Sequence, residues 1–308
     1  MQIRTDLAME SRENARAASG VVTRKLRQGD IEEIYVSIET EEGAQALGKP
    51  RGRYITCCHP QLAHASSETQ RRLARMLAAE IGALLPPFGD VLVIGLGNRR
   101  ITADALGSHV LESLLITRHM KDVTPDELTG RLRGVCAIAP GVLGVTGMET
   151  AEMVLGITQR VRPAAVIAID ALAARESGRI CTTIQVTDTG IRPGSGVGNH
   201  RMEISRETLG VPVIAIGVPM VVYAAVIARD ALSLLVRDMG LSEEEHAQAM
   251  DALVTKVTAE GLGELVVTPR EVDEMVGRVA QIIALGINIA LQKRLSEEEI
   301  LLLSHDGL

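Results

Sequence analysis

Short apolar runs recur along the chain, and most of them end in Gly, Asp or Pro shortly before a helical pattern begins. The clearest example is DVLVIG at 90–95, which a glycine turn connects to a helical pattern over 103–115. Similar runs lie at 135–138, 164–169 and 211–217. Strands that are apolar along their whole length are buried on both faces, so they need helical layers above and below them. We therefore predict an α/β fold, a three-layer sandwich with a mainly parallel sheet covered by helices.

The amino-acid composition agrees with such a core. Aromatic residues make up 1% of the 308 residues, so Ala, Val, Ile and Leu must fill the interior. So few rings, together with a net charge of -7, argue against binding to nucleic acid, which needs stacking platforms and basic surfaces. The N-terminal sequence lacks the apolar centre of a signal peptide, and no uninterrupted apolar run approaches the ~18 residues of a membrane span. We expect a cytoplasmic protein without a membrane partner.

Other segments predict elements around this sheet. Residues 21–38 alternate as two strands around the turn Gln28-Gly29-Asp30, and 66–85 have helical spacing that ends at Pro86-Pro87. The sequence after Val221 is mostly helical in pattern. We find no internal repeat and no interdomain linker.

The cysteines and histidines suggest no metal or cofactor. Four cysteines show no CxxC spacing, and none of the seven histidines has the spacing of a metal ligand pair. Cys57-Cys58-His59 lacks a third orienting group for a thiol nucleophile. His109 and His119 flank the helix after residue 103, where surface side chains are the simpler interpretation.

Two aspartates follow apolar runs of the predicted sheet. Asp104 comes just after the turn that follows 90–95, and Asp170 directly follows 164–169. Each carboxylate alone is explained as a cap for the helix after it, with the Asp170 helix starting at Ala171. Together they predict a hydrolase, because the carboxyl ends of parallel strands converge and a close carboxylate pair can supply one acid and one base. Asp188, before Gly190, is a third candidate that a turn explains.

Two glycine-rich loops are further candidates for binding sites. Gly95-Leu96-Gly97-Asn98 lacks the third glycine and the acidic residue of a dinucleotide site, so a tight turn is the better interpretation. The loop at 190–199 is either a pliant connection or a wall of the substrate site. Its residues of interest are Gly194, Ser195, Gly196, Gly198 and Asn199. Ser195 does not lie in a GxSxG strand-to-helix turn, which argues against a serine nucleophile.

Segments along most of the chain resemble the germination protease family, also called the spore protease family. The segments are IRTDLAME at 3–10, EEGAQALGKPRGRYIT at 41–56, VIGLGN at 93–98, ADALG at 103–107, LLITRHM at 114–120, APGVLGVTGMET at 139–150, IAIDALAAR at 167–175, TIQVTDTGIRPGSGVGNHR at 183–201 and TLGVPVIAIGVPMVV at 208–222.

The resemblance implies an endopeptidase that initiates degradation of small acid-soluble spore proteins during germination, in the cytoplasm of the forespore or spore core. It implies a zymogen, a homotetramer, no cofactor, and a phosphorylase/hydrolase-like fold related to hydrogenase maturation endopeptidases. The two essential aspartates of the family fall on Asp104 and Asp170. The family cuts after an acidic residue and before an aliphatic residue followed by Ala. Asp6-Leu7-Ala8 fits that rule, which predicts a propeptide at 1–6, cleavage between Asp6 and Leu7, and one protease domain at 7–308 with a β-rich N-terminal extension and a helical C-terminal part.

The sequence also departs from the family pattern. Ala103 replaces the usual proline before the first aspartate, Tyr223 replaces an aspartate, and the chain is short between Met239 and Val267. Two alternatives therefore stay open. One is a hydrogenase-maturation-type peptidase that recognises a metal on its substrate protein, and the other is a non-catalytic scaffold with the same fold.

Overall fold

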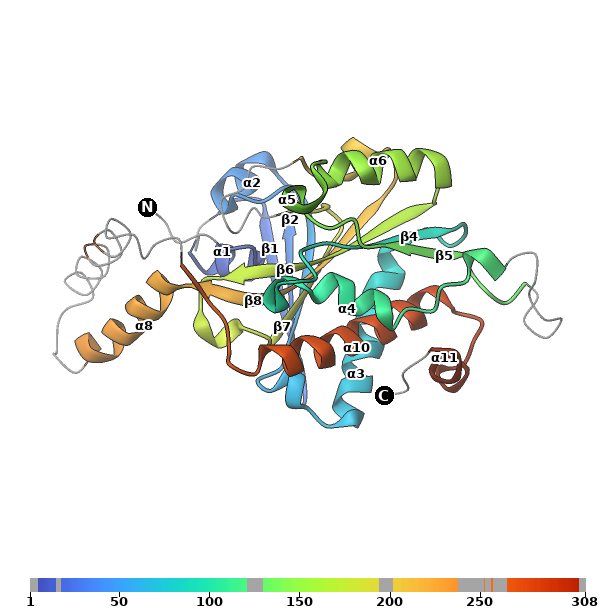
Figure 1. The fold of residues 1–308 in the computed structure, drawn as a ribbon. Coiled ribbons are helices and arrows are strands. Elements are labelled where there is room, and N and C mark those ends of the chain that lie inside the picture. Colours follow the sequence, from blue (N-terminus) through green and yellow to red (C-terminus); the bar gives the residue numbers. More distant parts are fainter. Residues whose placement is uncertain are drawn as a thin grey trace.

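The apolar runs of the sequence form the centre of one nine-stranded sheet, and helices cover both of its faces (Figure 1). The computed structural model describes residues 5–14, 18–120, 130–193, 202–237, 252, 256 and 265–304. The strands are β1 (Val21–Gln28), β2 (Ile31–Ile38), β3 (Gly52–Cys58), β4 (Val91–Gly95), β5 (Val135–Ile138), β6 (Ala165–Ala174), β7 (Thr183–Thr187), β8 (Val213–Tyr223) and β9 (Val266–Val267). The α-helices are α1 (Ala8–Asn14), α2 (Glu41–Leu47), α3 (Ser67–Leu84), α4 (Leu106–Glu112), α5 (Leu143–Thr146), α6 (Thr150–Val161), α7 (Arg206–Leu209), α8 (Ala224–Arg237), α10 (Val272–Leu291) and α11 (Glu297–Leu303). The α/β fold is confirmed.

The sheet combines a parallel and an antiparallel part. The strand order is β1-β2-β3-β7-β8-β6-β4-β5, and β9 pairs with β8. The strands β5, β4, β6 and β8 are parallel, whereas β1, β2, β3 and β7 pair only antiparallel with their neighbours. Parallel pairing therefore joins only four of the nine strands, so the sheet is mixed and not mainly parallel. The tight turn between β1 and β2 permits only antiparallel pairing of those two strands.

Three apolar clusters hold the layers together. The largest joins one face of the central strands to α3, α4 and α10, and includes Leu77, Ile167 and Ile283. On the opposite face, α6 packs over the start of β6, whereas the N-terminal segment and α2 pack over its end. The central strands are thus covered on both faces, as their continuous apolar sequence requires.

Among the described helices, α10 alone is long and apolar enough to cross a membrane by length and composition, with a mean hydropathy of 1.4. However, 67% of its most apolar window is buried inside the protein, where it packs against α3 and α4. It therefore has the environment of a core helix.

Two strands extend further than the sequence pattern predicts. The pairing of β6 with β8 continues to Ala174 and Val222, so no helix begins at Ala171 and that prediction is wrong. The run ALAA has good helix formers, but pairing with β8 overrides this local preference. Asp170 consequently lies inside β6 and does not cap a helix.

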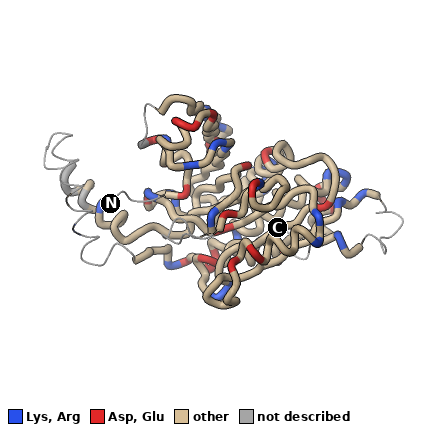
Figure 2. Tube along the Cα trace, turned by 90° about the horizontal axis from the view of Figure 1, so that it is seen from above, with Lys and Arg blue, Asp and Glu red and all other residues tan. Residues whose placement is uncertain are grey.

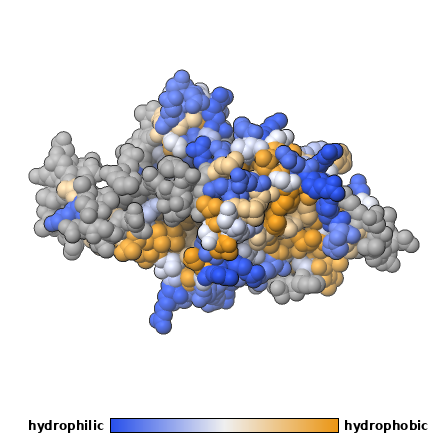
Figure 3. All heavy atoms as spheres, turned by 45° about the horizontal axis from the view of Figure 1, so that its top comes forward, coloured by the Kyte–Doolittle hydropathy of each residue, from blue (hydrophilic) through white to orange (hydrophobic). Residues whose placement is uncertain are grey.

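The surface is mixed in both charge and polarity. Figure 2 shows basic and acidic positions interspersed along the described chain. Figure 3 shows the molecule with the top of Figure 1 turned forward, and on this face apolar patches lie between hydrophilic ones. Exposed large apolar side chains include Leu143, Val145 and Met148 in and after α5. They follow β5, whose carboxyl end neighbours that of β4.

Candidate active site

The end of β4 packs directly against the start of α4. A Cβ atom added to Gly95 would lie 2.4 Å from the carbonyl oxygen of Gly107, and one added to Gly107 would lie 2.5 Å from the Leu96 nitrogen. Real side chains never approach so closely, so both positions require glycine. The contact confines the eleven residues between these glycines to a compact segment at the carboxyl end of β4.

Asp104 organises this loop. It ends the 3-10 helix η2 (Thr102–Asp104), and its Oδ2 accepts a hydrogen bond of 2.8 Å from the Asn98 nitrogen. Gly97 has a φ of +97°, and an added Cβ would lie 2.0 Å from the Asp104 carbonyl oxygen. The GLGN sequence is therefore a tight turn wrapped around Asp104, as the sequence analysis favoured over a dinucleotide loop.

Asp170 lies at the same edge of the sheet. Gly95, the last residue of β4, pairs with Ile169, and the Leu96 nitrogen donates to the Ile169 carbonyl oxygen at 2.8 Å. Asp170 is the next residue of β6, is 6% exposed, and accepts a hydrogen bond at Oδ1 from the Ala171 nitrogen. Because η2 packs against both β6 and β8, Asp104 and Asp170 both lie in the region at the carboxyl end of β4.

A row of three residues crosses the sheet at Asp170. Asp170 of β6 pairs with Gly217 of β8, which in turn pairs with Gln185 of β7. Residues paired in this way direct their side chains to the same face of a sheet. A Cβ added to Gly217 would lie 2.4 Å from Cδ1 of Leu172, so the position between Asp170 and Gln185 has no room for a side chain.

The N-terminal segment lies on this same face. The Asp6 nitrogen donates to the Ala173 carbonyl oxygen at 3.1 Å, and Oδ2 of Asp6 accepts from the Ala173 nitrogen at 2.9 Å. Gln185 Nε2 donates to the Asp6 carbonyl oxygen at 3.2 Å, and its Oε1 accepts from the Ala8 nitrogen at 2.8 Å. Leu7 is fully buried in the cluster that contains Leu172. The peptide bond between Asp6 and Leu7 is thus held beside the row that contains Asp170.

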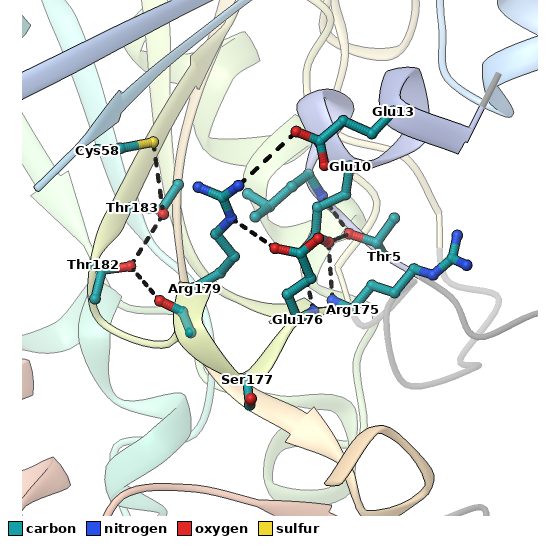
Figure 4. Close-up of polar contacts among 12 residues, drawn as sticks. Thr5, Glu10, Glu13, Cys58, Arg175, Glu176, Ser177, Arg179, Thr182 and Thr183 are labelled. Carbon is teal, nitrogen blue, oxygen red and sulfur yellow. Dashed lines mark hydrogen bonds and ion pairs between the residues drawn. The ribbon is translucent and has the colours of Figure 1, made fainter. Parts of the chain in front are cut away.

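Charged groups fix the segment further along the chain. Figure 4 shows Glu10 facing the turn after β6, where its carboxylate accepts hydrogen bonds from the nitrogens of Arg175 at 2.9 Å and Glu176 at 3.0 Å, and from the Thr5 hydroxyl. Burial raises the pKa of Glu10. Nζ of Lys49 donates to the Thr5 carbonyl oxygen at 2.9 Å. Burial lowers the pKa of Lys49, and the negative charges of Asp6 and Glu10 oppose that shift.

The other sequence candidates are engaged elsewhere. His109 pairs with Glu112 at 3.1 Å on the surface, and His119 is exposed. The ring nitrogens of His59 contact Asp30 and the Gln61 nitrogen, at 2.9 and 3.2 Å. Burial raises the pKa of the Cys57 thiol well above its usual value, which opposes thiolate formation.

The remaining candidates fall into two groups. Asp188 accepts hydrogen bonds from the backbone and the guanidinium of Arg53 at 2.8 Å, which accounts for it as a structural residue. The candidate loop residues Gly194, Ser195, Gly196, Gly198 and Asn199 lie outside the described residues. Within the described ranges, no cluster of three His, Cys, Asp or Glu side chains is arranged to hold a metal ion.

Two of the three departures from the family pattern occupy separate places, and the third, between Met239 and Val267, lies mostly outside the described residues. Ala103 lies in η2 and packs against the largest core cluster. Tyr223 ends β8 and packs against the cluster that contains Leu7. Neither substitution removes a carboxylate from the end of β4.

Gln185 is a residue that the sequence analysis missed. It is a polar residue in the otherwise apolar run TIQV, and it is 6% exposed. A buried amide needs partners for both its donor and its acceptor, and that requirement was the available signal. The partners lie 177 residues away or more, so the sequence pattern could not identify them.

Sequence comparisons with known proteins agree on one family. The sequence model described as Germination protease matches residues 1–262. The protein named Germination protease from Caldanaerobacter subterraneus subsp. tengcongensis is 44% identical to this chain, over 98% of this chain and 98% of that protein. The protein of the same name from Clostridium perfringens is 43% identical, over 97% of this chain and 98% of that protein. The Bacillus subtilis protein of the same name is 36% identical, over 96% of this chain and 95% of its own length. Among solved structures, the NiFe hydrogenase maturation protease HycI from Thermococcus kodakarensis KOD1 matches with 18% identity and a TM-score of 0.35, over 68% of this chain and 98% of that chain.

Proposed function

This chain belongs to the germination protease family, which makes it a peptide-bond hydrolase of spore germination, and on that premise we propose that Asp104 and Asp170 carry out the hydrolysis. The observation that supports the assignment is that both residues lie at the carboxyl end of β4. The turn at Gly97 holds Asp104 at the end of β4, and η2 packs against the strand that contains Asp170. Active sites of α/β sheets form at the carboxyl ends of the strands.

The proposed reaction uses the pair as one base and one acid. The ionised carboxylate takes a proton from water while the water oxygen bonds to the carbonyl carbon of the peptide. The protonated carboxyl then gives its proton to the amide nitrogen as the C–N bond breaks. The two groups end with one proton between them, as they began, and the products are a new carboxylic acid and a new amine, which then ionise in water. Two carboxyls held close favour this shared state, because like charges oppose ionisation of both.

We propose that residues 1–6 are a propeptide that the protein removes by cutting between Asp6 and Leu7. This bond has an acidic residue before it and Leu-Ala after it, and Asp6, Leu7 and Ala8 lie on the sheet face beside Asp170. A segment in that place hinders access of other peptides, and its removal opens the site. Residues 7–308 then form the single protease domain.

We propose small acid-soluble spore proteins as the substrates, cut after Glu or Asp and before an aliphatic residue followed by Ala. The buried position of Leu7 offers an apolar environment for such an aliphatic residue, and the exposed apolar side chains of α5 add surface near the carboxyl end of β4. We further propose that the protein acts as a homotetramer in the cytoplasm of the forespore and spore core, without a cofactor.

Asp104→Asn and Asp170→Asn test the catalytic assignment. Asparagine keeps an oxygen that accepts from the Asn98 or Ala171 nitrogen, so the local hydrogen bonds survive while acid–base chemistry is lost. We expect turnover of a peptide containing Glu-Ile-Ala to fall by about 10²-fold or more in each variant. Mass spectrometry of the products, with and without a chelator, measures this.

Asp188→Asn is the matched control, since that carboxylate contacts Arg53 and should leave turnover unchanged. Full activity of Asp104→Asn or Asp170→Asn would refute the acid–base pair. Activity that disappears with the chelator would instead favour a peptidase that recognises a metal on its substrate.

A further inference from the structure

We propose that Gln185 positions the peptide backbone of the substrate, binding it on both sides of the bond that is cut. The inference rests on the proposed function, in which the segment around Asp6-Leu7-Ala8 occupies the active site as a substrate does. Gln185 would be a positioning residue, because it contacts the substrate backbone but takes no part in proton transfer.

The argument starts from the two hydrogen bonds of Gln185. Its Nε2 donates to the carbonyl oxygen of Asp6, the residue before the bond, at 3.2 Å. Its Oε1 accepts from the nitrogen of Ala8, the second residue after the bond, at 2.8 Å. One amide group therefore spans the Asp6–Leu7 bond. Both contacts are to backbone atoms, so any peptide whose backbone follows the same path would make them.

The position of Gln185 in the sheet supports this role. Gln185 and Asp170 are separated by Gly217 alone in the row across β7, β8 and β6, which corresponds to two strand spacings of about 4.8 Å each. Both side chains lie on the face that carries the N-terminal segment. Because β7 and β8 are buried central strands, Gln185 is anchored to the same rigid sheet as Asp170.

The hydrogen bond to the Asp6 carbonyl has a further consequence. A donor on this oxygen withdraws electron density from the carbonyl and holds the group in one orientation, which favours attack by water. The acceptor on the Ala8 nitrogen fixes the chain two residues later. Together the two bonds set which peptide bond lies opposite the aspartates, so the loss of Gln185 should change the place of cleavage as well as its rate.

The chain provides a matched control in Gln292. This residue is 1% exposed, and it also spans a backbone segment, donating to the Arg133 carbonyl oxygen at 3.1 Å and accepting from the Arg133 nitrogen at 2.9 Å. Gln185→Met and Gln292→Met thus remove the same two kinds of hydrogen bond while keeping a side chain of similar length. Only the first change affects the N-terminal segment.

The test uses the full chain and follows two measurements. Intact-mass spectrometry gives the rate and position of cleavage near residue 6, and steady-state kinetics of the processed protein with a Glu-Ile-Ala peptide give KM and kcat. We expect Gln185→Met to raise KM about tenfold, as the loss of two hydrogen bonds predicts, and to produce cuts at neighbouring bonds. Gln292→Met should lower the melting temperature and leave KM and the cut unchanged.

Gln185→Glu sharpens the result, because at neutral pH it keeps the acceptor for the Ala8 nitrogen and loses the donor for the Asp6 oxygen. Its KM should lie between those of wild type and Gln185→Met. An unchanged KM with a single cut after Asp6 in Gln185→Met would overturn the inference. Absence of turnover in the wild-type protein would overturn the proposed function itself, and this inference with it, before any Gln185 variant is compared.

Discussion

The parallel and antiparallel halves of the sheet differ in what their buried strands contribute to the proposed active site. In the parallel half, β4 ends beside Ile169 of β6, so the loop with Asp104 and the strand residue Asp170 both lie at the carboxyl end of β4. In the antiparallel half, β7 contributes no carboxylate to that edge but holds the N-terminal segment through Gln185. The parallel half thus supplies the proposed chemistry, whereas the antiparallel half supplies a platform for a peptide.

The difference follows from strand direction. Parallel strands place all their carboxyl ends at one edge, so residues from separate loops meet there. Antiparallel strands joined by short turns have no such common edge, and their side chains serve as a surface. The strand β8 belongs to both halves, since it pairs with β6 on one side and β7 on the other.

Gly97→Ala should break the parallel half and have the largest effect. The change adds a Cβ within 2.0 Å of the Asp104 carbonyl oxygen at a residue with a φ of +97°, so the turn must open and Asp104 must move. We expect peptide turnover to fall about 10²-fold, the cost of a displacement near 1 Å in a catalytic group. Product analysis by mass spectrometry measures the loss.

Gly210→Ala is the control for this experiment. Gly210 also has a positive φ, +72°, but no atom lies within 4 Å of an added Cβ. It should be destabilised by about 1–2 kcal/mol and keep its turnover per folded molecule. Equal loss of turnover in both variants would mean that backbone strain alone explains the effect of Gly97→Ala.

Gly217→Ala tests the boundary between the halves. The added methyl group would lie 2.4 Å from Cδ1 of Leu172 in a buried part of the sheet. We expect the free energy of unfolding to fall by about 1–3 kcal/mol, as overpacked cores do. Urea denaturation measures this free energy.

Gly156→Ala in α6 is the control. An added Cβ there meets no atom within 4 Å, so the change should instead raise the free energy of unfolding by about 0.5–1 kcal/mol. If Gly217→Ala were as stable as the wild type, β8 and β6 would have to shift relative to each other without loss of stability, which would contradict tight packing at this boundary.

A pH series sharpens the description of the antiparallel half and should give the smallest effect. Burial raises the pKa of Glu10 above its ordinary value of 4.5, so the docked segment binds a proton more tightly than the free one. The contribution of Glu10 to docking is fully present below pH 4.5 and is lost as pH rises through the raised pKa. Hydrogen exchange at the Arg175 and Glu176 nitrogens, corrected for intrinsic rates, should therefore accelerate with pH.

Glu10→Gln, which has no charge to lose, should remove this dependence. Protection that increases with pH would contradict the assigned direction. The assignment of Asp104 and Asp170 does not depend on this result, because the hydrogen bonds of Glu10 are to Thr5, Arg175 and Glu176.

Much of the fold could be predicted because its units are local. The strand, turn and helix around Asp104 are encoded by neighbouring residues, and the glycines at 95, 97 and 107 are needed for backbone contacts within that unit. The hairpin at 21–38 and the helix α3 follow equally from alternation and helical spacing. The location of both aspartates at the carboxyl end of β4 was also accessible, because parallel strands share an edge.

The sequence by itself therefore determined the α/β layers and the placement of Asp104 and Asp170 after apolar runs that form neighbouring parallel strands. Only the tertiary structure decided that β6 continues past Asp170, that the Asp6–Leu7 bond lies on the sheet, and that Gln185 spans it. These features depend on hydrogen bonds and apolar contacts between segments up to 179 residues apart. A sequence pattern carries the periodicity of one element, whereas such contacts arise only when separate elements pack.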